Sequence, residues 1–209
     1  MVLDEGLSLE RRWLFSSASP TSMTLAALAG NQARVCYHIG GPRAVCKDIQ
    51  WTGSILEYSA IENLCEDCDN EASGTVNNQV ISCFSTPNGS SPRCVFWNAS
   101  NVSHTVNLQA TSVSAMAVGS ISSTLALVCY AASPAIYCIK SDERAGAGLS
   151  ASPTLIDYVT TSSIAVHSVR DGMAVLCIAT DELQCYVLSV DVTRLSQAAA
   201  RRAWPVPIT

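Results

Sequence analysis

The stretch ARVCYHIGGPRAVCKD, from Ala33 to Asp48, decides how the chain folds. Cys36 and Cys46 each lie among Val, Ala and Tyr residues, and Gly40-Gly41-Pro42 stands between the two runs. Apolar, β-branched runs on both sides of a Gly-Pro turn predict a β-hairpin. Two cysteines that face each other in such a hairpin predict a disulfide across its strands.

The hairpin recurs along the chain. The first cysteines of four such pairs are spaced 47, 46 and 48 residues apart, and the pairs are Cys36/Cys46, Cys83/Cys94, Cys129/Cys138 and Cys177/Cys185. Self-similarity at this period marks a repeat architecture, and three or four short strands per repeat is typical of a β-propeller blade. We therefore predict an all-β fold, a β-propeller with about four visible blades in a single domain, with one disulfide-stapled hairpin per blade. The predicted ranges are 1–209 for the domain, 22–74, 75–112, 113–161 and 162–205 for the repeats, and 13–21 for the end of a preceding blade.

Composition excludes several classes of function. Of the 209 residues, 48% are hydrophobic and 14% are charged, which favours a packed core over disorder. The net charge is −5 and the basic residues are scattered, so no patch fits a nucleic-acid backbone. No apolar run reaches the ~18 residues of a membrane-spanning helix. The sequence holds no GxSxG, Walker, HExxH or GxGxxG motif, and we predict neither a metal nor a cofactor.

The ten cysteines indicate in which cellular compartment the protein folds. An even number of cysteines favours disulfides in a secreted protein. The first twenty residues lack a basic segment followed by an apolar one, so no signal peptide is visible. Either a leader is missing from this chain or the cysteines are unpaired, and we favour the first. Glycosylation sequons at Asn88, Asn98 and Asn101 support a secretory route.

Metal and redox chemistry are the alternatives for the cysteines. A zinc site requires cysteine or histidine pairs that converge on one point, whereas these pairs are spread one to each repeat. Cys65 and Cys68 form the only CxxC motif, in an acidic loop that disfavours a reactive thiolate. We predict a fifth, local disulfide there, with redox or metal use as the alternative.

The residues around the first hairpin resemble those of a known family. Leu25-Ala-Ala-Leu, then ARVCYHI, then AVCKDIQW are similar to the successive strands of a blade in the fungal fucose-specific lectins, the Aleuria-type six-bladed β-propellers. Trp13–Ser22 and Ala203–Thr209 are similar to blade ends. The resemblance implies a sugar held between adjacent blades by an Arg, an acidic residue and an aromatic residue.

The hairpin register tests this implication. If Cys36 faces Cys46, Arg34 faces Asp48, and this pair can bind the vicinal hydroxyls of a sugar with Trp51 as the nearest stacking candidate. The alternative is an ordinary cross-strand ion pair. The equivalent positions in the other repeats have lost the polar pair, and they are Ile81/Phe96, Leu127/Lys140 and Val175/Val187.

Three functions are consistent with these observations. The first is a secreted, fucose-lectin-like propeller that binds a carbohydrate or another small molecule in a pocket between blades. The second is a cofactor-independent cyclase, similar to the propeller-fold hetero-Diels–Alderases of fungal secondary metabolism, in which an apolar pocket holds the reacting groups close together. The third is a secreted scaffold or host-interaction protein. Four hairpins fall short of six blades, so we also expect a truncated chain, a hidden blade, or a homo-oligomer that completes the propeller.

Overall fold

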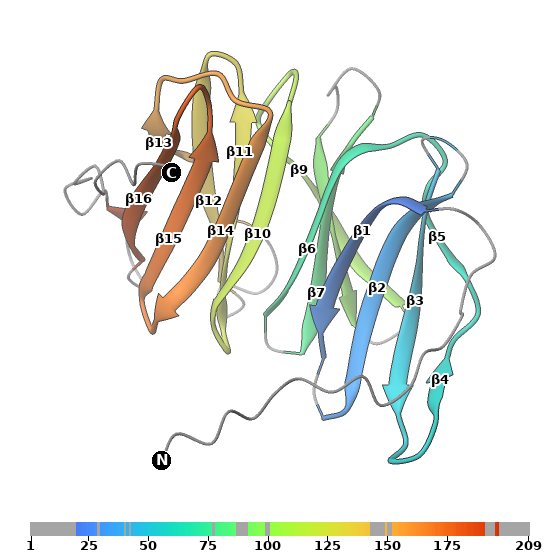
Figure 1. Cartoon of the computed structure of the whole chain (residues 1–209). Coiled ribbons are helices and arrows are strands. Elements are labelled where there is room, and N and C mark those ends of the chain that lie inside the picture. The colour runs from blue at the N-terminus through green and yellow to red at the C-terminus, as the bar shows by residue number, and fades with distance from the viewer. Residues whose placement is uncertain are drawn as a thin grey trace, which may run out of the picture.

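The structure is a computed structural model of the whole chain (Figure 1). It describes residues 20–28, 30–39, 41, 43–76, 78–86, 92–98, 101–142, 149, 152–190 and 195–196. Every described element is a β-strand, as the alternation of Val, Ile, Leu and Tyr with polar residues predicts. The described residues form no helix with the length and apolarity needed to cross a membrane.

The strands form four antiparallel sheets, each built from consecutive segments of the chain. The first sheet has the order β1-β2-β3-β4, with β5 also paired to β3, and its strands are β1 (Pro20–Ala27), β2 (Gln32–Ile39), β3 (Ala44–Trp51), β4 (Leu56–Tyr58) and β5 (Glu62–Cys65). The second sheet consists of β6 (Asp69–Val76), β7 (Gln79–Ser85), β8 (Arg93–Asn98) and β9 (Asn101–Asn107).

The other two sheets follow the same plan. The third consists of β10 (Ala115–Ser122), β11 (Leu125–Ala132), β12 (Ala135–Asp142) and β13 (Thr154–Asp157). The fourth consists of β14 (Ser163–Arg170), β15 (Met173–Ala179), β16 (Leu183–Val190) and β17 (Leu195–Ser196). Gly172 has a φ of 73° in the turn between β14 and β15, a conformation that a residue with a Cβ rarely adopts.

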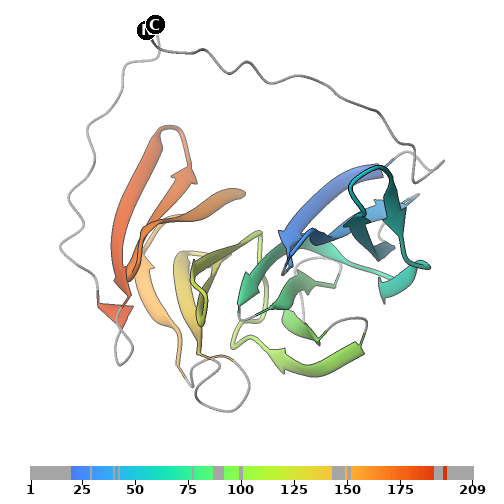
Figure 2. The same ribbon diagram turned by 90° about the horizontal axis from the view of Figure 1, so that it is seen from below.

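The sheets stand side by side in an arc, with the first and fourth at its two ends (Figure 2). The first strand of each sheet, β1, β6, β10 or β14, packs against the first strand of the next. Polar side chains join these strands: Thr24 Oγ1 donates to Ser73 Oγ at 3.0 Å, and Ser168 Oγ donates to the carbonyl of Ile121 at 3.2 Å. This radial arrangement of four-stranded sheets is that of propeller blades.

The predicted disulfides are confirmed. Four disulfides join register partners on the second and third strands of the four sheets, and they are Cys36–Cys46, Cys83–Cys94, Cys129–Cys138 and Cys177–Cys185. The fifth disulfide, Cys65–Cys68, is local. Each of the first four closes a loop of eight to eleven residues, which on the chain-entropy model stabilises the fold by about 2–3 kcal/mol.

The core lies between the sheets. In the first three sheets, the face that carries the disulfide packs against the opposite face of the next sheet, so that Cys36 and Cys46 share a cluster with Val80, Val95 and Trp97. The six cysteines of the first three hairpins have no exposed surface. Cys177 and Cys185 of the fourth hairpin are only half-buried.

The start of the second sheet differs from the predicted repeat boundary. β6 begins at Asp69, inside the range 22–74 that we predicted for the first repeat. Its sequence, DNEASGTV, is polar and contains a glycine, so its strand character is weak. The range predicted for the end of a preceding blade, 13–21, overlaps β1, which already begins at Pro20, and residues 13–19 lie outside the described residues.

Candidate functional site

Arg34 and Asp48 form a bidentate ion pair on the first sheet. They are register partners on β2 and β3, two positions from the disulfide. Arg34 Nε donates to Asp48 Oδ1 at 2.7 Å, and Nη2 donates to Oδ2 at 2.9 Å. The side chain of Arg34 is 1% exposed and that of Asp48 is 22% exposed. The pair is therefore a partly buried bidentate contact, with the guanidinium in the interior and the carboxylate at the surface.

Glu62 completes the cluster. It lies on β5, which pairs with β3 beside Cys46, and its Oε2 is 3.3 Å from Arg34 Nη2. Burial raises the pKa of Glu62, Arg34 lowers it, and the charge of Asp48 raises it further. Its side chain is 24% exposed. One guanidinium thus holds two carboxylates, and solvent reaches both carboxylates but not the guanidinium.

The aromatic neighbour of Arg34 comes from the second sheet. The guanidinium carbon of Arg34 lies 4.4 Å from the ring centroid of Trp97 on β8, within range of a cation–π interaction. The indole Nε1 of Trp97 is buried and has no hydrogen-bond partner among the described residues. Trp51 stands an odd number of positions from Asp48 on β3, so its side chain lies on the opposite face of the sheet. The structure therefore does not bring Trp51 together with Arg34.

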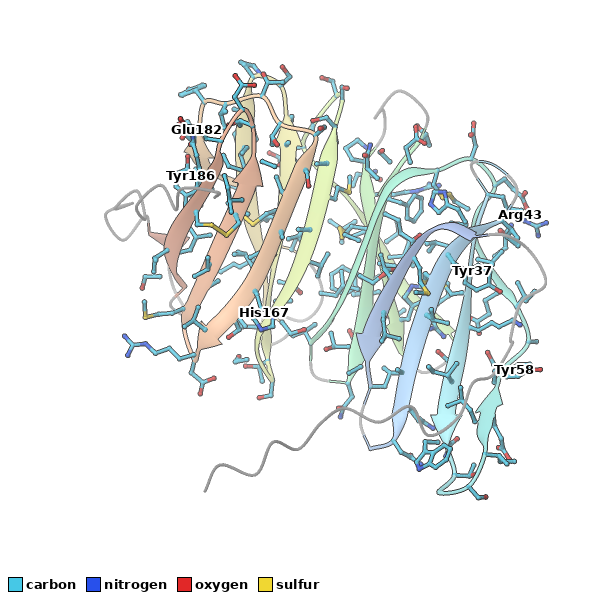
Figure 3. The ribbon with its side chains drawn as sticks, in the orientation of Figure 1. Tyr37, Arg43, Tyr58, His167, Glu182 and Tyr186 are labelled. Carbon is cyan, nitrogen blue, oxygen red and sulfur yellow. A yellow bond between two sulfur atoms is a disulfide. The ribbon has the colours of Figure 1, made fainter. Side chains whose placement is uncertain are left out.

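A hollow of about 330 Å³ adjoins the ion pair. Its lining combines carboxylates, amides, hydroxyls and apolar side chains, and consists of Leu28, Gln32, Asp48, Ile49, Gln50, Glu57, Tyr58 and Ser59. Gln32 Nε2 donates to Gln50 Oε1 at 3.2 Å, and the Asp48 amide donates to Ser59 Oγ at 2.9 Å. Tyr58 lies on β4 at the edge of the first sheet (Figure 3) and is 52% exposed.

The equivalent positions in the other sheets are register partners, as predicted. Ile81 and Phe96 are buried between the second and third sheets. Leu127 is buried between the third and fourth sheets, opposite the half-buried Lys140. Val175 and Val187 are half-buried on the fourth sheet. The polar pair occurs on the first sheet alone among these four hairpins.

A second polar cluster lies where the first strands begin. His38 Nε2 on β2 is 3.4 Å from Glu71 Oε2 on β6, and the Glu71 side chain is fully buried. Thr24 Oγ1 donates to Glu71 Oε1 at 3.1 Å. The neighbouring Glu71 carboxylate raises the pKa of His38, although burial acts in the opposite direction. Sequence reasoning missed this pair, because the two residues are far apart in the chain.

A metal site finds little support in the described residues. The only group of potential metal ligands among them is Cys36, Cys46 and Glu71. Both cysteines are bonded to each other and offer no thiolate. Among the predicted glycosylation sites, Asn88 lies outside the described residues, and the side chains of Asn98 and Asn101 are not described either.

Comparison with known proteins identifies the fold. No protein-family model and no curated protein matches the sequence. Among solved structures, the SapL1 lectin in complex with α-methyl fucoside matches at a TM-score of 0.61 with 12% identity, over 88% of this chain and 65% of that one. The lectin of Aleuria aurantia, also with α-methyl fucoside, matches at 0.59 with 14% identity, over 88% and 63%. AofleA of Arthrobotrys oligospora matches at 0.57 with 12% identity, over 87% and 56%.

The chain thus spans less than two thirds of the length of each of these three structures. Identities of 12–14% establish similarity of fold and leave the ligand open. The four antiparallel sheets, their arrangement in an arc and these matches agree with the resemblance seen in the first hairpin. The chain has the β-propeller fold of the Aleuria-type fucose-specific lectins.

Proposed function

We propose that the protein binds a carbohydrate at one site, in the hollow beside the Arg34–Asp48 pair. The observation that carries this proposal is the cluster in which buried Arg34 holds Asp48 and Glu62 toward solvent under the ring of Trp97. Carboxylates fixed in this way accept hydrogen bonds from neighbouring hydroxyl groups of a sugar without a further loss of side-chain entropy.

The hollow has a suitable size and lining. Small-molecule sites begin at about 300 Å³, and this hollow measures about 330 Å³. Asp48 and Glu57 supply acceptors, and Gln32 and Gln50 supply amide groups that both donate and accept. Leu28 and Ile49 supply the apolar part of the lining, whereas the ring of Tyr58, at its edge, faces Lys47 at 4.8 Å on the other side of the sheet. Alternating donors and acceptors beside an apolar surface match the chemistry of a monosaccharide.

Arg34 acts as a positioning residue in this proposal. Only 1% of its side chain is exposed, so it orients the carboxylates and does not itself reach most of the ligand. Two of the structural neighbours are in complex with α-methyl fucoside, which makes this compound the first probe to use. The cyclase alternative gains no support from the apolar replacements, because Ile81, Phe96 and Leu127 fill the space between sheets.

We also place the protein in the secretory pathway. Five disulfides and no free cysteine among the described residues favour an oxidising compartment, because thiols stay reduced in the cytosol. The predicted sequons agree with this route.

Calorimetric titration with α-methyl-L-fucoside, together with a glycan array, tests the function. We expect binding with a stoichiometry of one, and we expect Asp48→Asn to weaken it at least tenfold, the effect of about 1.5–3 kcal/mol lost with a charge-assisted hydrogen bond. Lys140→Ala is the matched control, because Lys140 occupies the same register position on the third sheet.

Two outcomes contradict the proposal. One is a wild-type protein that binds no glycan on the array and no fucoside in solution. The other is binding that Asp48→Asn leaves unchanged, which locates the ligand elsewhere. Circular dichroism and thermal unfolding of each variant establish that a loss of binding is not a loss of folding.

A further inference from the structure

We infer that the hollow beside the Arg34–Asp48 pair selects a sugar with a positively charged amine over neutral and acidic sugars. This inference rests on the proposed function, because it concerns the same hollow. It adds the chemical class of the ligand, which is an amino sugar whose nitrogen is not acetylated. The charges around the hollow lead to this class.

Three carboxylates lie on one face of the first sheet, the face that packs against the second sheet. Asp48 lies on β3 between Cys46 and Gln50, two positions from each. Glu62 on β5 is the register partner of Cys46, and Glu57 on β4 is the register partner of Gln50. Alternate residues of a strand, and register partners on neighbouring strands, point to the same face. Both sheets of this junction belong to the described part of the chain.

Two of these carboxylates, those of Asp48 and Glu57, line the hollow. The amides of Gln32 and Gln50 lie beside them, with Gln32 Nε2 donating to Gln50 Oε1. Among the described residues, the lining includes no Lys or Arg. Glu57 is exposed, so a ligand reaches its carboxylate without a rearrangement of the sheet.

The positive charges of this region do not balance the carboxylates. Arg34 contacts Asp48 and Glu62, and its side chain is 1% exposed. One positive charge against three negative charges, with Glu57 counted, leaves a net charge of −2 around the hollow. Three further cations contact other groups, and they are Lys47 against the ring of Tyr58 on the opposite face of the sheet, Arg93 against the ring of Phe84, and Arg43 beside Glu66.

An amino sugar fits this distribution of charge. Its ammonium group offers three donors and one positive charge to the carboxylates, while its hydroxyl groups pair with the glutamine amides. A neutral sugar leaves the excess negative charge without a partner in a partly desolvated hollow. A carboxylate or sulfate group on the ligand is repelled by charges of its own sign. Acetylation of the nitrogen removes the positive charge and with it the preference.

A second observation favours a bound sugar over a solvated acidic patch. The indole Nε1 of Trp97 is buried and has no hydrogen-bond partner among the described residues, and Trp97 is 5% exposed. Its ring lies 4.4 Å from the guanidinium carbon of Arg34, in the same junction. Buried donors are rarely left unpaired. A sugar hydroxyl that reaches past Asp48 would supply the missing acceptor.

Calorimetric titration with two matched pairs of probes tests the inference. One pair is methyl α-L-fucoside and its 2-amino-2-deoxy analogue, and the other is methyl β-D-glucoside and methyl β-D-glucosaminide. At about pH 6.5 the amines are protonated, as an α-amino group with a pKa of ~7.7–8.0 would be. In each pair that binds, we expect the amine to bind at least tenfold more tightly, a difference of about 1.4 kcal/mol.

Two further measurements identify the preference as electrostatic. Raising the salt concentration from about 20 mM to about 500 mM should reduce the tenfold preference to about twofold, because the Debye length falls below the size of the site. Methyl β-D-glucuronide, which carries a carboxylate, should bind more weakly than methyl β-D-glucoside at low salt.

A matched pair of variants locates the preference. Glu57→Gln replaces a carboxylate by an amide of the same shape and should lower the ratio of the two affinities at least threefold. Glu182→Gln is the control, because Glu182 is an exposed residue between β15 and β16 on the fourth sheet (Figure 3) and should keep the wild-type ratio. Thermal unfolding of both variants checks that each retains its fold.

The outcomes separate this inference from the proposed function. Equal binding of amine and neutral sugar, a preference that Glu57→Gln leaves unchanged, or a preference that salt does not reduce would each overturn the inference and leave carbohydrate binding intact. The absence of binding by every probe and on the glycan array would overturn the proposed function, and the inference with it.

Discussion

The junction between the first two sheets and the junction between the last two share the same arrangement of strands and disulfide, but their side chains differ in chemistry. In both, a disulfide joins register partners on the second and third strands, and two positions away a residue of the second strand points into the junction. At the first junction this residue is Arg34, which holds two carboxylates beneath Trp97. At the last it is Leu127, which is buried in a cluster with Leu176 and Leu188.

The comparison shows that the position of a side chain and its chemical role are determined by different parts of the sequence. The disulfide and the strand register determine where the residue at this position points, and the residue type determines whether the junction becomes a polar cluster or part of the core. A polar site is thus a local substitution in a repeated structure. Substitutions can therefore give one junction the residues of the other, or alter the disulfides and strand contacts that both junctions share.

The largest effect is expected from replacing the guanidinium. Arg34→Leu gives the first sheet the residue of the third and leaves Asp48 and Glu62 without their cation, which should lower the free energy of unfolding by about 3–5 kcal/mol. Arg34→Leu/Asp48→Lys copies the whole pair of the third sheet and should recover part of this loss, because the new lysine can pair with Glu62. Urea denaturation measures both. A single variant as stable as the wild type would mean that the cluster adds nothing to folding.

The disulfides should differ between the interior and the end of the arc. Removing Cys129–Cys138 by Ala substitution loses about 2.5 kcal/mol of loop entropy and about 1 kcal/mol more from buried packing. Removing Cys177–Cys185 in the same way should cost about 2.5 kcal/mol, because these residues are already half-exposed. Denaturant unfolding of the two double variants compares them directly. Equal losses would contradict a dependence of each disulfide's contribution on its burial.

At Gly74 and Gly119 the neighbouring first strand comes too close for a side chain, whereas the equivalent position of β1 is the buried Ala26. Gly74→Ala forces a Cβ against Val118 and should cost about 1–3 kcal/mol. The control is His167→Ala at the equivalent position of the fourth sheet, where the side chain is exposed, and it should change stability by less than about 0.5 kcal/mol. Thermal unfolding at low protein concentration gives both values, and a neutral Gly74→Ala would mean that the junction can widen.

The smallest expected effect concerns pH and the His38–Glu71 pair. Because the pKa of His38 is raised in the folded state, its contribution is fully present below the ordinary histidine value of 6.5 and is lost as pH rises through the raised value. The groups acting on His38 are Glu71, Asp69 and the backbone at Gly41. The free energy of unfolding should fall between about pH 6 and pH 8 in the wild type. In His38→Gln this slope should flatten, and an unchanged slope would assign it to another group.

The hairpins and the polar pair could be predicted because both depend on neighbouring strands. Strand alternation and the cysteine spacing determine which residues face each other, and the register of Arg34 with Asp48 follows from that of Cys36 with Cys46. β6 could not be delimited in this way, because its polar sequence resembles a loop and its strand character depends on packing against β1 and β10.

The rest of the site depends on contacts between strands that are not neighbours in the sequence. Glu62 reaches Arg34 because β5 returns to β3 after β4, which the register of a single hairpin does not reveal. Trp97 comes from the next sheet, and strand parity is the signal that identifies it: Phe96 faces the third sheet, so Trp97 faces the first. The same parity argument shows why Trp51, although near in sequence, turns away from Arg34.

The cross-strand disulfides also bear on how such a protein changes over evolutionary time. In an ordinary hairpin, a mutation that weakens one strand can shift the pairing by one residue, and every side chain then turns to the wrong face. A covalent bond between register partners forbids that slip, as at Cys83 and Cys94. Each junction is therefore free to accumulate substitutions independently of the others. The architecture can therefore persist while one junction gains or loses a specificity without endangering the rest.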